Sequence, residues 1–317
     1  MDVSIIICTH NGADALGGTL ESLRRIDVPS GQDVELLLVD NASTDRTPDV
    51  ISEFEHPLIT IRSLCEPKPG KSRALNRSIR QAAGDVLLFT DDDVRFPSDW
   101  IEAMSRPILE GETDAVAGGV QLAPELEQPW MSPWHKFILG STESIPLSED
   151  DQFFGANMAV SKIVFDKISG YDERLGPGGE GLGSAEDTLL AWQLRETAFH
   201  IRGRPDVTVE HHPDPSLIRP SSFRARTEGL GRSEAYISYH WEHRRWPIWK
   251  LYAGWVYYQI RLIVLNFQSK SAVPEGIDMS KKEFEVRRRM ARIHQHLRER
   301  GTPPKYHKRG TMKKNGR

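Results

Sequence analysis

Two hydrophobic periods alternate along the first 120 residues. Apolar or alternating stretches that predict β-strands lie at 3–8, 34–40, 58–63 and 85–90. Apolar residues recur every three or four positions, as on an amphipathic helix, at 13–26, 47–54, 71–84 and 99–109. Strands and helices in strict alternation predict a mostly parallel sheet with helices on both faces, an α/β fold.

The pattern changes after residue 120. Residues 121–152 are rich in proline and polar residues and predict a connecting region, and regular structure resumes over 153–175. A glycine-rich loop at 176–185 then leads into a helix that begins at Glu186. A short strand further on ends at two adjacent histidines, His211 and His212.

Polar side chains follow three of the predicted strands where each strand ends. They are Thr9, His10 and Asn11 after the first, Asp40 and Asn41 after the second, and Asp91, Asp92 and Asp93 after the fourth. Ligands of open α/β sheets bind at this carboxyl edge. Three adjacent carboxylates raise one another's pKa unless a cation lies among them, and Mg²⁺ and Mn²⁺ prefer oxygen ligands. The sequence therefore predicts a divalent-cation site.

Composition and charge narrow the class of protein. Hydrophobic residues make up 38% and charged residues 27% of the 317-residue chain, as in a folded globular protein. The net charge of −4 conceals an uneven distribution, because residues 281–317 carry 14 Lys/Arg and 3 Asp/Glu. We expect no signal peptide, no membrane-spanning helix, and reduced, partly buried thiols at Cys8 and Cys65.

Six motifs stand in the order found in one enzyme family. They are SIIICTHN, LLLVDNASTD, GKSRALN, AAGDVLLFTDDDV, GANMAVSKIVFDKISGYDERL and AEDTLLAWQLR. Over about residues 1–215 the chain resembles the family 2 glycosyltransferases of the GT-A fold. The resemblance implies an inverting, metal-dependent hexosyltransferase-type enzyme. Its donor would be a nucleoside-diphosphate sugar, most simply a UDP-sugar.

The resemblance implies roles for the acidic run. Asp91 would contact the ribose of the donor, Asp92 would lie in the same nucleotide-sugar site, and Asp93 would bind Mn²⁺ or Mg²⁺. Relatives place a histidine on the same metal. We favour His211 as this metal ligand, and the adjacent His212 stays as the alternative.

Further donor-binding residues follow from the same resemblance. Asp40 would contact uracil, and Thr9 and Asn11 would line that pocket. Lys71 and Arg73 lie at the start of a predicted helix, beside its free N–H groups. Basic residues at this position would bind the diphosphate of the donor.

The acceptor side rests on two motifs. Transfer to a hydroxyl requires a carboxylate that removes its proton, and the resemblance assigns this general base to Asp187. Glu186 would orient the acceptor beside it, and Asn157 would bind the acceptor.

We expect four regions in the chain. Residues 1–120 would form the nucleotide-sugar half and 121–215 the acceptor and base half. Residues 216–280 would form a helical extension, and 281–317 a basic, partly disordered tail. Aromatic residues at helical spacing between Trp246 and Leu262 indicate either a helix packed on the body or an interfacial helix on a membrane.

The sequence thus predicts a transferase that acts on a saccharide or lipid-linked acceptor in polysaccharide or glycolipid synthesis. We expect it in the cytoplasm, in peripheral contact with the inner face of the cell membrane, and we expect no specific nucleic-acid partner. Two alternatives stay open, a sugar-phosphate nucleotidyltransferase and a catalytically silent nucleotide-sugar-binding protein. The first normally carries a basic, glycine-rich phosphate loop after its first strand, and THNGADALGG has no basic residue besides histidine.

Overall fold

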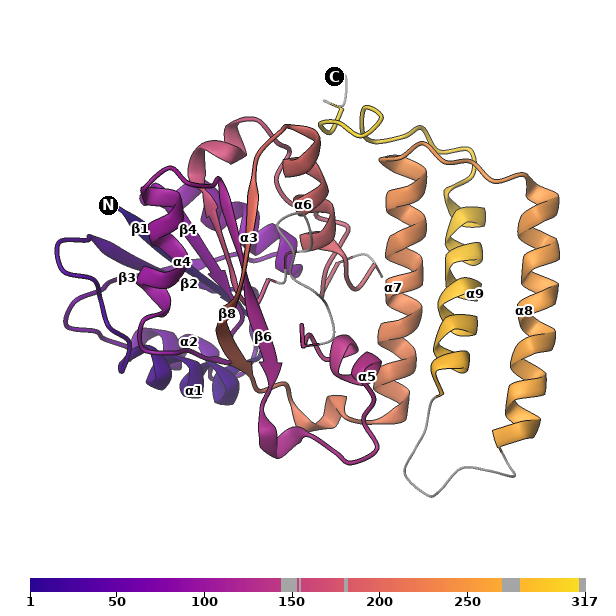
Figure 1. Ribbon diagram of the computed structural model, residues 1–317, viewed down its shortest axis with the longest axis horizontal. Helices are drawn as coiled ribbons and strands as arrows, with labels where there is room; N and C mark the ends of the chain where they lie inside the picture. The colour runs from indigo at the N-terminus through magenta and orange to yellow at the C-terminus, as the bar shows by residue number, and fades with distance from the viewer. Residues whose placement is uncertain (144–152, 154, 180–181, 270–279, 314–317) are drawn as a thin grey trace.

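The computed structural model describes residues 1–143, 153, 155–179, 182–269 and 280–313. An eight-stranded sheet with the order β3-β2-β1-β4-β7-β6-β8-β5 forms the body of the protein, and three long helices lie to one side of it (Figure 1). The strands are β1 (Val3–Thr9), β2 (Val34–Asp40), β3 (Thr60–Cys65), β4 (Val86–Thr90), β5 (Val94–Arg95), β6 (Ala115–Leu122), β7 (Met158–Ser161) and β8 (Ile201–His211).

The helices are α1 (Ala13–Leu23), α2 (Thr47–Ser52), α3 (Lys71–Gln81), α4 (Trp100–Leu109), α5 (Pro133–Ile138), α6 (Glu186–Glu196), α7 (Pro220–His240), α8 (Ile248–Ser269) and α9 (Lys281–Glu299). Short 3₁₀ turns lie at Pro124–Leu126, Lys162–Asp166 and Pro215–Leu217.

Both faces of the sheet are covered, as the continuous apolar strands predict. Along β1, Ile5 and Ile7 pack with α1, α2 and α4, whereas Ile6 and Cys8 pack with α3 and α6. All four side chains are at most 9% exposed. Successive residues of a strand point to opposite faces, so only a strand buried on both sides carries such an unbroken apolar run.

The topology brings the ends of several strands to one edge. Strands β1, β2, β3 and β4 are parallel, and Thr9 pairs with Asp40 in register. Strand β7 is antiparallel to both β4 and β6, so it begins at the edge where β4 ends. This edge therefore receives the carboxyl ends of the parallel strands together with the residues that precede β7.

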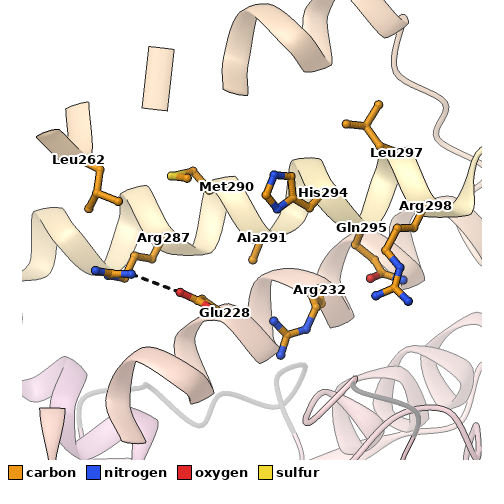
Figure 2. Close-up of a pocket in the computed structure, with 10 residues that line it drawn as sticks. All are labelled: Glu228, Arg232, Leu262, Arg287, Met290, Ala291, His294, Gln295, Leu297 and Arg298. Atoms are coloured by element: carbon orange, nitrogen blue, oxygen red, sulfur yellow. Dashed lines mark hydrogen bonds and ion pairs between the residues drawn. The ribbon is translucent and has the colours of Figure 1, made fainter. Parts of the chain in front are cut away.

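The C-terminal part forms a layer of three helices, in which α9 lies between α7 and α8 (Figure 1). Apolar clusters join α7 to the body: Phe223 packs with Leu122 and Leu139, and Tyr236 packs with Leu175. A pocket of about 500 Å³ is lined by residues of α7 and α9 together with Leu262 of α8. Figure 2 shows these residues, among them Arg287, which forms an ion pair with Glu228. None of the helices within the described ranges has the length and apolar character needed to cross a bilayer.

A buried carboxylate fastens the C-terminal region to the body. Asp172 is 3% exposed, and its Oδ2 accepts hydrogen bonds of 2.6 Å from the hydroxyls of both Tyr236 and Tyr306. Residues from α7 and from beyond α9 therefore meet at one atom of the segment that follows β7.

Several boundaries differ from those predicted. Strand β3 begins at Thr60 rather than at residue 58, because its register with β2 starts at the Glu35 pair, and Leu58 stays 65% exposed. Helix α3 ends at Gln81, three residues earlier than expected, because Ala82 is already extended. Cys65 is exposed because β3 is the edge strand of the sheet. Residues 144–152 of the predicted connecting region lie outside the described residues.

Candidate active site

A pocket of about 450 Å³ lies at this edge of the sheet. Seven of the side chains predicted from the sequence line it: Thr9, Lys71, Asp91, Asp92, Asp93, Asp187 and His211. They come from the end of β1, the N-terminus of α3, the segment after β4, the first turn of α6 and the end of β8. Residues more than 200 positions apart thus converge, because these elements all end or begin at the same edge.

The acidic run and one histidine form a cluster with metal-ligand chemistry. Ligand atoms of Asp91, Asp93 and His211 all lie within 4.8 Å of one another. His211 Nε2 lies 3.1 Å from Asp93 Oδ2, and its Nδ1 lies 2.7 Å from the carbonyl oxygen of Leu139, which orients the ring. His212 turns away and pairs with Glu210 and Glu125. Of the doublet, His211 is the residue that faces the acidic run.

The cluster fits a divalent cation. Asp93 Oδ1 is buried and has no hydrogen-bond partner within the described part of the chain, so a carboxylate oxygen is left for another ligand. Burial raises the pKa of Asp93, but the charge and hydrogen bond of His211 outweigh it and hold the pKa below its ordinary value. Burial and the adjacent Asp93 raise the pKa of Asp92 to about 7. Two carboxylates and an imidazole suit Mg²⁺ or Mn²⁺, and no particular ion is selected.

Lys71 supplies a positive charge opposite the carboxylates. Its ammonium group forms an ion pair with Asp91, and the charges of Asp91, Asp187 and Glu186 raise its pKa even though burial lowers it. The ammonium group is therefore charged throughout the neutral range. It lies where it can contact an anionic ligand that enters the pocket.

Asn41 holds the loop that leads to Lys71. Its carboxamide nitrogen donates to the carbonyls of Glu66 and Lys68, at 3.1 and 2.8 Å, and its oxygen accepts from Gly70 N–H at 2.8 Å. Gly70 has φ +137°, a conformation that side chains disfavour, so glycine allows the sharp entry into α3. The position of Lys71 thus depends on one buried asparagine at the end of β2.

Asp187 lies in the first turn of α6, on the pocket wall. Gly155 N–H donates to its Oδ2 at 2.9 Å, whereas its Oδ1 has no hydrogen-bond partner among the residues described. A Cβ at position 155 would lie 2.8 Å from Oδ2, so only glycine permits this approach. Burial raises the pKa of Asp187 to about 6. A carboxylate that ionises near neutrality and has one free oxygen can accept a proton.

Glu186 lies behind Asp187, away from the pocket lining. It is 6% exposed, and burial together with the charge of Asp187 raises its pKa to about 8. Two adjacent acids with raised pKa values belong to one coupled pair, in which Glu186 holds its proton more firmly at neutral pH.

Other predicted residues lie outside the pocket lining. Asp40 accepts from Ser43 N–H, and Asn11 accepts from Thr44 N–H, so both stabilise the loop after β2. Arg73 forms an ion pair with Glu173. Asn157 is fully buried; it accepts from Trp100 Nε1 and donates to the carbonyls of Gly119 and Val207. The structure does not bring Asn157 to the pocket, because these bonds hold its carboxamide inside the sheet.

Three polar residues of the pocket had no role assigned from the sequence: His10, Asn41 and Arg226. The first two were expected at this edge, because they follow strand ends. Arg226 comes from α7, outside every motif, and its guanidinium donates to the carbonyl of Ile138 at 3.0 Å. Nothing local in the sequence marks it.

The sheet order, the carboxylate cluster and the acidic start of α6 agree with the GT-A fold expected from the sequence. The family model for glycosyl transferase family 2 matches residues 4–168, just over half of the chain. This chain therefore belongs to the family 2 glycosyltransferases. The earlier alternative of a sugar-phosphate nucleotidyltransferase is set aside.

Named relatives agree with this family. "Probable glycosyltransferase YdaM" of Bacillus subtilis is 24% identical over 231 residues, which cover 67% of this chain and 51% of YdaM, so the chain spans about half of that protein. The poly(ribitol-phosphate) beta-N-acetylglucosaminyltransferase TarS of Staphylococcus aureus is 33% identical over 96 residues, 29% of this chain and 16% of TarS.

A solved structure supports the fold. The mannosyltransferase PcManGT from Pyrobaculum calidifontis, solved in complex with GDP-Man and Mn²⁺, superposes with a TM-score of 0.56 at 18% identity. The match covers 95% of this chain and 76% of that one. It extends the likeness in fold beyond the matched region and into the C-terminal helices.

Proposed function

We propose that this protein transfers a hexose from a UDP-sugar to an acceptor hydroxyl with inversion at the anomeric carbon. The observation that carries the proposal is the convergence of the acidic cluster, Lys71 and Asp187 in one pocket. Family membership supports glycosyl transfer, and the roles of individual residues are our assignments.

On the donor side, Asp91, Asp93 and His211 would hold the divalent cation and Asp91 would also contact the ribose. A bound Mn²⁺ or Mg²⁺ supplies positive charge to the departing diphosphate. Lys71 would bind a diphosphate oxygen through its ammonium group. Thr9 and Asn41 would lie against the nucleoside, since both line the pocket beside the acidic run.

On the acceptor side, Asp187 would remove the proton of the attacking hydroxyl through Oδ1. The new bond forms between that oxygen and the anomeric carbon while the bond to the diphosphate oxygen breaks, and one displacement inverts the carbon. Gly155 N–H keeps Oδ2 in place during this step. Glu186, neutral at pH 7, would act on the acceptor only through its neighbour Asp187, because it does not line the pocket.

We assign residues 1–120 to the donor half and 121–215 to the acceptor half. TarS is named for a poly(ribitol-phosphate) acceptor. This is consistent with polysaccharide or glycolipid synthesis, with a saccharide or lipid-linked acceptor. The choice of UDP follows from the sequence resemblance, whereas PcManGT was solved with GDP-Man. Titration of the protein with UDP-, GDP- and dTDP-sugars tests which nucleotide it binds.

The variant Asp187→Asn tests the base. We expect sugar transfer to fall by about 10²-fold or more, because an amide cannot accept the proton, while Mn²⁺-dependent binding of the donor changes little. Asp166→Asn, an exposed aspartate at the end of a 3₁₀ turn, is the matched control and should transfer at the parent rate. Transfer by D187N at the parent rate refutes the assignment. A parent protein that binds donors but transfers none to any acceptor would favour the silent binding protein.

A further inference from the structure

Helix α8 presents an apolar face to solvent. It is the outermost helix of the C-terminal layer (Figure 1). Its inner side packs on α9, where Trp255 Nε1 donates to His294 Nε2 at 2.9 Å, and Leu251 and Leu265 are 5% and 9% exposed. Its outer face consists of residues on one side of the helix that are 49–65% exposed: Trp249, Tyr252, Val256, Tyr257, Ile260 and Ile263. We call these six residues the outer face of α8.

This exposure is unusual for a folded chain. Soluble proteins expose large apolar side chains singly, and a contiguous apolar patch marks a surface that another molecule covers. The outer face of α8 runs along a helix of 22 residues, about 33 Å at 1.5 Å per residue. Because the opposite side of the helix is fixed to α9, a partner must lie alongside α8.

The charges beside this face indicate the partner. Residues 243–269 contain no Asp or Glu but do contain Arg245, Lys250 and Arg261, besides Arg244, which pairs with Glu242 just before this segment. Lys250 lies over the ring of Trp249 and Arg261 over that of Tyr257, at 5.4 and 6.0 Å from the ring centroids. Within the described residues, neither Lys250 nor Arg261 forms an ion pair. Cations seated on aromatic rings at the border of an apolar stripe are typical of helices that lie in a membrane interface.

A second copy of the chain fits this face less well. Two α8 helices packed face to face and antiparallel would bring Lys250 of one copy near Arg261 of the other, with no acidic residue in the segment to compensate. Anionic lipid headgroups provide the opposite charge along the whole border.

We propose that the outer face of α8 binds the surface of an anionic phospholipid bilayer. Trp249, Tyr252 and Ile260 enter the headgroup region, and Lys250 and Arg261 contact lipid phosphates. The helix lies parallel to the bilayer plane, because its inner side stays packed on α9. This surface is separate from the donor pocket, and binding to it does not depend on the proposed transfer reaction.

The test is flotation of the purified full-length chain with vesicles. We expect binding to vesicles that contain phosphatidylglycerol, weaker binding to pure phosphatidylcholine, and a decrease as salt rises. The double variant Trp249→Ser/Ile260→Ser should lose binding by about tenfold or more, because two apolar anchors are removed. Lys250→Glu/Arg261→Glu should lose the preference for anionic vesicles.

Matched controls exist on the body of the protein. Leu58 and Ile163 are 65% and 62% exposed, similar to the 65% of Trp249. The variant Leu58→Ser/Ile163→Ser should therefore bind vesicles like the parent. Circular dichroism melts confirm that each variant is folded. The proposal is overturned if the parent ignores anionic vesicles or if the α8 variant binds them equally well. It is also overturned if light scattering finds a dimer that the α8 variant dissociates while no vesicle binding occurs.

Discussion

At the scale of single residues, the chemistry of the site depends on neighbouring ionisable groups that shift one another's pKa values. Asp187 and Glu186 are sequence neighbours at the start of α6, and burial raises the pKa of each. Lys71 and Asp91 face Asp187 from α3 and from the end of β4, and their charges act in opposite directions on its ionisation. The surroundings of the two acids, rather than their residue types, therefore set their pKa values apart.

This pair makes a prediction about pH. With the pKa of Asp187 raised to about 6, its carboxylate is ionised above pH 6 and protonated below it. The protonated form cannot accept the hydroxyl proton, so kcat/KM should fall about tenfold for each pH unit below 6. Glu186→Gln should keep this acidic limb, because Glu186 is already neutral there. Initial rates from pH 5 to 8, with folding checked by circular dichroism, decide it. A limb near pH 4, the ordinary range of an aspartate, would show that the pKa of Asp187 is not raised in the working protein.

At the scale of elements, the loop between β3 and α3 depends on Asn41. Asn41→Ala leaves the buried Gly70 N–H without its acceptor and the part-buried carbonyls of Glu66 and Lys68 without their donor. We expect a loss of about 1–3 kcal/mol in the free energy of unfolding, together with weaker donor binding because Lys71 moves. Asn41→Asp keeps the acceptor for Gly70 N–H. Its free energy of unfolding should therefore lie between that of the parent and that of Asn41→Ala. Urea unfolding and donor titration measure both effects. Unchanged donor affinity in a destabilised N41A variant would limit Asn41 to a structural role.

The elements of the donor half were predictable from the sequence alone, and the reason is local. Strands buried on both faces carry unbroken apolar runs, and helices between them carry a period of 3.6, so β1, β2, β4, α1 and α4 appear close to their predicted positions. Seven of the predicted side chains line the pocket, because strand ends of a parallel sheet share one edge.

The remaining parts could not be predicted, because their partners are distant in sequence. Asn157 looked like an acceptor ligand beside Gly155, yet Trp100, 57 residues earlier, holds its carboxamide inside the sheet. Arg226 reaches the pocket only because α7 packs against the segment around Leu139. Tertiary packing determines where such side chains lie, and no local sequence pattern predicts that packing.

At the scale of the whole molecule, the body and the C-terminal helices are joined through Asp172. Tyr306→Phe removes one of the two hydroxyl donors to this buried carboxylate while Tyr236 remains. We expect a loss of about 1–3 kcal/mol in the free energy of unfolding and faster tryptic cleavage in the segment that contains Arg309. Tyr257→Phe, on the exposed side of α8, should change neither quantity. Equal stability of Y306F and the parent would show that Tyr236 alone satisfies Asp172.

The same carboxylate has a consequence for biosynthesis. Tyr306 is made 134 residues after Asp172, which at about 5–20 residues per second takes a ribosome roughly 7–27 s. Throughout that interval the growing polypeptide has strands β1 to β4 but not the last hydroxyl that secures the body to the C-terminal layer. The junction at Asp172 therefore stays incomplete, and open to chaperones and proteases, until the segment beyond α9 has been made.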